Sequence, residues 1–147
     1  MTPNNNFIEQ RIIGAVRKLL TGRVNEILRD EEFPTPVIEF GNFGCGYGVS
    51  PVVALSSCER TEKERIIRLD AYSLTIVFSL PESFEAESQC YACAGAVCMA
   101  LKENPTLGGV VDRAVVCGEK YVPPKKPNFG QGWGVVVSLR LTVEGMG

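Results

Sequence analysis

The sequence predicts an α+β fold, with a mixed or antiparallel sheet of four to five strands packed by two main helices in the order α-β-β-β-α-β-β. Between residues 72 and 80, and again between 134 and 144, apolar and other residues alternate strictly. Such alternation is typical of a strand with one face on a core and the other toward water or a partner. Residues 8–20 instead repeat apolar side chains at helical spacing.

A single domain spanning residues 1–147 is expected. The chain has 147 residues, of which 45% are hydrophobic. A chain of this size buries about 68–70% of the surface that it exposes when unfolded, which is enough for a core without disulfides or metals.

The N-terminal part is expected to start with a frayed segment, residues 1–6, followed by an amphipathic helix. Ile8, Ile12 and Val16 lie at helical spacing, with Arg11 and Arg17 between them. This helix ends near residue 22 or continues, after a kink, through residues 24–28. Residues 33–36 contain two prolines and are predicted to be an extended linker into a short strand over residues 37–40.

Four glycines fall within residues 41–48, a segment that also contains Phe43 and Tyr47. Glycines permit positive φ and close backbone approach. A nucleotide-binding loop would lie between a strand and a helix, whereas a strand pattern over residues 49–58 follows here. We therefore interpret the segment as a mobile loop or a bulged connection. The polar residues 59–65 are predicted to form the charged tip of a hairpin, whose second strand covers residues 66–80.

The second helix follows Pro81, which ends the long strand because proline cannot donate to a ladder. Ser83 is predicted to cap the helix, and Asn104-Pro105 to end it. One stripe is expected to cover the sheet: Cys90, Ala94, Val97 and Leu101. The opposite side is small and uncharged, where a surface helix normally presents charge. We expect another backbone there, either the N-terminal helix or a neighbouring subunit, against Ala92, Gly95, Ala96 and Met99.

The C-terminal part is predicted to contain a turn over residues 106–109, a strand over 110–117 and a closing strand over 134–144. Between the two strands, residues 118–131 are rich in proline, lysine and glycine. We predict that they form a long loop, and a loop of this length within a compact domain is usually functional or disordered.

Six cysteines and no histidine limit the metal and redox chemistry of the chain. Cys90 and Cys93 have C-x-x-C spacing, but they lie two turns into a predicted helix. Zinc ribbons place such a pair on a turn, and reactive pairs lie at a helix start after a strand. We interpret the cysteines as small buried apolar residues, and we expect no cofactor. A cysteine-ligated metal site is the alternative.

Sequence motifs for catalysis are absent. No histidine is available as a general base near neutral pH, and no G-x-S-x-G, H-E-x-x-H or Walker motif occurs. Asp70 and Asp112 lie on predicted strands, and we expect a surface role for Asp70. The sequence therefore offers no positive indication of an enzyme.

Charge and hydropathy also bear on the partners. The net charge is −2, from 15 basic and 17 acidic side chains mixed along the chain, whereas nucleic-acid binding needs a concentrated basic face. No apolar run approaches the roughly 20 residues of a membrane span, and the N-terminus lacks the pattern of a signal peptide. We expect protein partners, no nucleic-acid recognition, no membrane, and a cytoplasmic location until the protein joins something larger.

Over residues 36–144 the order and character of the segments resemble the tail-terminator and tail-completion (neck) proteins of long-tailed bacteriophages, of the lambda tail-terminator type. The most telling part is the turn over residues 104–109 after a helix, with a closing strand led by Trp133. The resemblance also includes the following segments: 74–78, 91–94, 116–118, 121–124 and 139–144.

The resemblance implies an α+β subunit that assembles as a ring, expected to be hexameric, on the head-proximal end of the tail tube. Such a ring ends tube polymerisation and offers a joining surface to the head-tail connector, without catalytic residues. The virion tail, after assembly in the host cytoplasm, would be its location. Besides the helix side above, the expected contacts with the ring or the tube are Phe43, Tyr47, Lys120, Tyr121, Pro123, Pro124, Lys125, Lys126 and Phe129.

Alternative functions remain open at this point. Within the same particle, the protein could be a head-tail connector or neck adaptor. In other classes, it could be a small-molecule-binding regulatory α+β domain that uses the glycine loop, or a cysteine-ligated metal protein. The mass of the native assembly distinguishes a ring from a dimer with a bound metabolite or a zinc-loaded chain.

Overall fold

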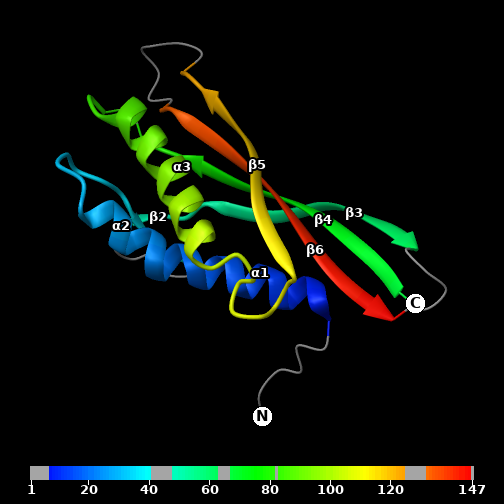
Figure 1. The fold of residues 1–147 in the computed structure, drawn as a ribbon. Coiled ribbons are helices and arrows are strands. Elements are labelled where there is room, and N and C mark those ends of the chain that lie inside the picture. Colours follow the sequence, from blue (N-terminus) through cyan, green and yellow to red (C-terminus); the bar gives the residue numbers. More distant parts are fainter. Residues whose placement is uncertain (1–6, 41–47, 63–66, 82, 125–131, 147) are drawn as a thin grey trace.

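The computed structural model describes residues 7–40, 48–62, 67–81, 83–124 and 132–146. It confirms the α+β class and shows two layers: a four-stranded antiparallel sheet and, on one of its faces, the helices (Figure 1). A two-stranded parallel sheet lies beside the N-terminal helices. The order of the elements agrees with the predicted one, apart from subdivisions of the first helix and of the first strands.

The N-terminal helix is continuous but contains one wide turn. It consists of α1 (Ile8–Leu19), the π-helical turn η1 (Leu20–Val24) and α2 (Asn25–Arg29). Its buried residues recur every four positions: Ile12, Val16, Leu20, Val24 and Leu28. Residues four apart drift around an α-helix of 3.6 residues per turn, and a wider turn offsets this drift. The expected kink is therefore a π-turn that keeps one apolar stripe on the core.

The small sheet pairs β1 (Val37–Ile38) with β2 (Gly48–Val49) in parallel. The buried side chain of Asn25 holds this sheet to the helix. Its Nδ2 donates to the carbonyl of Ile38 at 2.9 Å, and its Oδ1 accepts from the Ile38 N–H at 2.8 Å. Most of the glycine segment, including Phe43 and Tyr47, lies outside the described residues.

The main sheet has the strand order β3-β4-β6-β5, with every neighbouring pair antiparallel. Its strands are β3 (Val52–Glu62), β4 (Ile67–Ser79), β5 (Arg113–Val122) and β6 (Gly134–Met146).

Two predicted loops are partly wrong. Residues 59–62 belong to β3, and residues 118–122 belong to β5. Both segments lie on edge strands, where charged side chains can point into solvent while the backbone pairs on its inner side.

The second helix, α3 (Ala86–Glu103), ends where predicted but begins two residues later than a cap at Ser83 would require. Glu85 occupies the N-cap position without a side-chain hydrogen bond. After the helix, Leu107 has a φ of 52°, and Gly108 and Gly109 have φ values of 72° and 91°. This turn brings the Pro105 carbonyl to within 2.7 Å of the Ala114 nitrogen. Strand β5 therefore begins at Arg113 rather than at residue 110.

The core lies between the sheet and the helices. From the sheet come alternate residues of β4 and β6, namely Tyr72, Leu74, Ile76, Phe78, Val135, Val137, Leu139 and Leu141. Asp70 lies on the same face of β4 and is only 5% exposed, which corrects the expected surface role. Arg68 Nη2 donates to its Oδ2 at 3.0 Å, and Arg68 Nε lies 2.9 Å from its Oδ1. The carboxylate is thus buried beside a guanidinium.

Candidate interaction surface

The face of the sheet opposite the helices is the candidate functional site. Helix α3 contacts β5 and β6, and α1 contacts β3, so the helices account for one face only. The strand registers align the opposite side chains in rows across all four strands. One row contains Val52, Val77, Val136 and Lys120, and the next contains Ala54, Thr75, Ser138 and Gly118. We call these eight residues the open sheet face.

The open sheet face is accessible and carries little charge. Val52 is 61% exposed, Ala54 is exposed, and Thr75, Val77, Val136 and Ser138 are half-buried. Its only charged residue, Lys120, lies on the edge strand β5. Further along the same face the rows become charged, with Glu59, Arg113, Arg140 and Glu144. The uncharged part therefore occupies one end of the sheet, near the last residue of β5.

A hollow of about 420 Å³ adjoins this end of the face. Its apolar wall includes Val77, Val122, Pro123, Trp133 and Val136. The hollow is kept in shape by a close approach of two chain segments, in which the Leu80 N–H donates to the carbonyl of Trp133 at 2.8 Å. A Cβ on Gly132 would lie 1.5 Å from the Leu80 carbonyl oxygen, so only glycine fits at this position.

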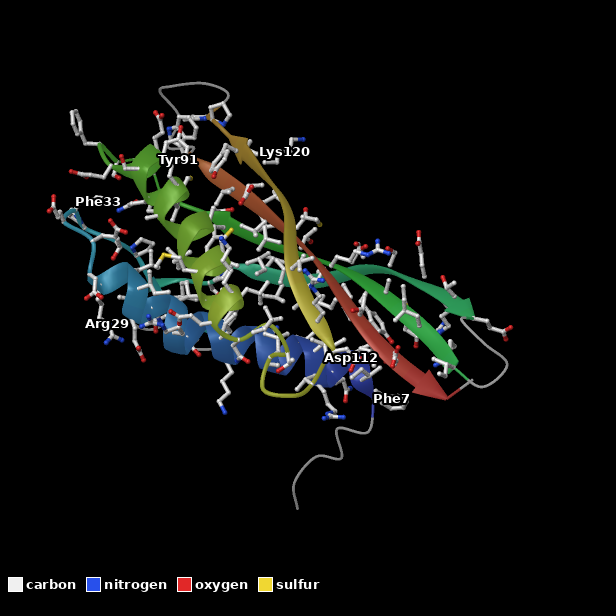
Figure 2. All side chains as sticks on the ribbon, viewed as in Figure 1. Phe7, Arg29, Phe33, Tyr91, Asp112 and Lys120 are labelled. Atoms are coloured by element: carbon white, nitrogen blue, oxygen red, sulfur yellow. The ribbon has the colours of Figure 1, made fainter. Side chains whose placement is uncertain are left out.

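The predicted contacts in residues 118–131 divide between the two faces. Lys120 belongs to the open sheet face, and Pro123 and Pro124 line the hollow. Tyr121 points to the helix side, where its ring meets that of Tyr91 edge-on at 5.0 Å. Figure 2 shows Tyr91 and Lys120 at the same end of the molecule. The other predicted contacts, Lys125, Lys126 and Phe129, lie outside the described residues.

The predicted contact side of α3 is only partly free. Ala96 is 2% exposed in the single chain, so its assignment to a subunit interface is wrong. Helix α3 contacts η1 and α2, which supports the alternative that the N-terminal helix covers part of this side. Ala92 is half-buried against the core. Gly95 is exposed and Met99 is 52% exposed, so these two remain accessible to a partner.

The cysteines lie in several different environments. Burial raises the pKa of the Cys90 thiol to about 11 and that of Cys93 to about 12, so both are un-ionised near neutral pH. Cys98 donates to Glu119 Oε1 at 3.3 Å, and Cys117 is exposed. Within the described ranges, no group of three or more His, Cys, Asp or Glu side chains is placed to hold a metal ion.

The open sheet face was not predicted as a site from the sequence. The signal in the sequence was the other half of the alternating pattern, the residues between the inward-facing apolar ones. Ser73, Thr75 and Val77 on β4, and Val136 and Ser138 on β6, are small or β-branched and uncharged. A solvent-facing strand surface usually carries more charge than this. That the two sets share one surface follows only from the pairing of β4 with β6.

Comparisons with known proteins do not identify a relative. A scan against protein families finds no match for this chain, and a search of curated proteins finds none either. Among the described residues, none of the helices combines the length and the apolar character needed to cross a membrane.

Proposed function

We propose that this protein is a structural subunit of a long-tailed bacteriophage. It forms a ring of six copies at the head-proximal end of the tail tube. The ring ends polymerisation of the tube and presents the surface to which the head-tail connector joins. Its partners are other copies of itself, the tail tube protein and the connector. It is assembled in the host cytoplasm and remains in the virion tail.

The open sheet face is the observation that carries this proposal, as the surface that meets the tube protein. Charged groups are depleted in the cores of protein interfaces, because their desolvation costs more than their pairing returns. Seven of the eight residues of the face are uncharged. Small and β-branched side chains lose little rotamer entropy when a partner covers them. The backbone beneath them is fixed by the ladders of the sheet, so the surface is already organised for binding.

The proposed function is tested by electron microscopy of particles assembled without this protein. Overlong tubes are expected, because nothing then stops polymerisation. Tubes of normal length that lack heads would instead indicate a neck adaptor that acts after termination. Particles of normal form and infectivity would contradict both functions.

Introducing a charged side chain on the open sheet face tests whether this surface contacts the tube protein. Val77→Asp should lower the yield of infectious particles at least tenfold, because the carboxylate would be buried without a partner, at a cost of about 3–5 kcal/mol. Thr61→Asp is the matched control, since Thr61 lies on the same side of the sheet among the charged rows. Circular dichroism of both purified variants should match the parent protein. Equal yields from the two variants would exclude the open sheet face as the contact.

A further inference from the structure

Phe84 is the most exposed large apolar side chain described in this protein. It precedes α3, and its exposed fraction is 100%. Burying a phenylalanine side chain gains about 1.5–3 kcal/mol relative to leaving it in water, and aromatic residues are frequent anchors of protein interfaces. Two carboxylates follow it within three residues, those of Glu85 and Glu87. The start of α3 therefore presents an exposed aromatic ring next to two acidic side chains.

A hollow with basic instead of acidic side chains lies between α1 and the turn that follows α3. Its volume is about 620 Å³. Its apolar residues are Ala15, Leu19, Leu107 and Val110, and three glycines leave it open: Gly14, Gly22 and Gly108. The charged residues that line it are all basic, namely Arg11, Lys18 and Arg23.

The basic residues of this hollow differ in their pairing. Arg23 is bound to Glu103, with Nε 2.6 Å from Oε1, and also contacts Glu26. Arg11 and Lys18 form no ion pair with any carboxylate in the described part of the chain. Two cations beside an apolar depression are thus available to an incoming acidic group.

A single copy cannot bring Phe84 to this hollow. The two features lie at opposite ends of α3, and an 18-residue helix is about 27 Å long. In Figure 1 the start of α3 and the segment that follows its other end lie far apart, with the latter beside α1. A contact between them therefore requires two copies, in which different surfaces meet. Repeated contacts of this head-to-tail type close into a ring when the rotation between copies allows it.

We propose that Phe84 of one copy inserts into the hollow between α1 and residues 104–110 of the next copy, while Glu85 and Glu87 approach Arg11 and Lys18. This inference rests on the proposed ring function and specifies its subunit contact. It leaves the open sheet face free for the tube protein. A second hollow, between α3 and β5, is lined by Lys102 and Arg113 but also by Glu119. It therefore fits the acidic residues beside Phe84 less well than the first hollow, whose charged lining residues are all basic.

The mass of the native assembly tests this contact. Phe84→Ala should raise the concentration at which the ring dissociates at least tenfold, and Lys18→Glu should do the same by repelling the acidic segment. Combining Lys18→Glu with Glu87→Lys should restore assembly, which a merely destabilising effect on the fold would not do. Val37→Ala is the control, because it removes an exposed apolar side chain that belongs neither to the hollow nor to the open sheet face, and it should leave the mass unchanged.

The other outcomes separate this contact from the proposed function. A ring that is unaffected by Phe84→Ala and by Lys18→Glu would exclude the contact but not the ring. A ring lost in Met99→Ala and retained in Phe84→Ala would place the subunit interface on the side of α3 instead. A parent chain that stays monomeric at high concentration would contradict the ring, and this contact with it.

Discussion

The two faces of strand β4 share one backbone but differ in what they contact. On the helix side, Leu74, Ile76 and Phe78 are at most 1% exposed. On the other side, Thr75 and Val77 are half-buried, although the chemical difference between Val77 and Ile76 is one methylene group. The comparison shows that hydrophobicity alone does not decide which residues form the core. The helices decide it, because they cover one face only.

This difference separates residues that maintain the fold from residues that we expect to bind partners. Substitutions on the helix side should lower the free energy of unfolding, because they open cavities in a packed interior. Substitutions on the open sheet face should lower it much less and affect assembly instead. Three stability measurements can break or sharpen this contrast.

The largest effect is expected from truncation of neighbouring residues on the two sides of β4. Phe78→Ala should lower the free energy of unfolding by about 3–5 kcal/mol, because Phe78 is fully buried. Val77→Ala should lower it by less, about 1 kcal/mol. Urea denaturation followed by circular dichroism measures both. Similar losses in the two variants would mean that the open sheet face contributes to the core as much as the helix side does.

A smaller effect is expected where the hollow adjoins the open sheet face. Gly132→Ala should destabilise the protein by about 1–3 kcal/mol, because the added Cβ would overlap the Leu80 carbonyl. Gly95→Ala is the matched control, since no neighbouring atom lies within 4 Å of the added Cβ. Alanine favours a helix over glycine, so this control should be stabilised by about 0.5–1 kcal/mol. An unchanged midpoint for Gly132→Ala would show that the two segments do not approach closely in solution.

The smallest effect concerns the thiols that α3 buries in the core. Cys90 and Cys93 have pKa values raised to about 11 and about 12 from an ordinary value of 9.0. Their native state thus retains protons that the unfolded state releases, so stability should fall as the pH rises above about 9. We expect a loss of about 1–2 kcal/mol between pH 8 and about pH 9.5 in urea titrations. Cys93→Ala should flatten this dependence, and a parent protein with constant stability over this range would contradict the burial of both thiols.

Several features of the fold could be predicted from the sequence, because they depend on local patterns. The alternation in β4 and β6 identified both central strands and their inward residues, and the four-residue spacing from Ile12 identified the first helix. The stop at Asn104-Pro105 and the turn at Gly108-Gly109 were predicted by residues with strong conformational preferences. Failures fell where a partner strand overrides local composition. Residues 118–122 look like part of a loop, yet they pair with β6.

The candidate site was harder to predict than the fold. Lys120, Pro123 and Pro124 were predicted as contacts, and they lie on or beside the open sheet face. Ala96 was assigned to the interface by its small size, but a small residue also suits the close packing of two helices in one chain. Phe84 was not singled out, because its complete exposure follows from how α3 begins rather than from its neighbours in the sequence.

By itself, the sequence determined the two kinds of element, their order, and the inward residue of each central strand, because the periods of helices and strands are properties of the local chain. Only the tertiary structure decided that the helices gather on one face of the sheet, that Asp70 is buried beside Arg68, and that Phe84 is fully exposed. These outcomes depend on segments far apart in the chain. Their meeting is set by how the layers bury their combined apolar surface.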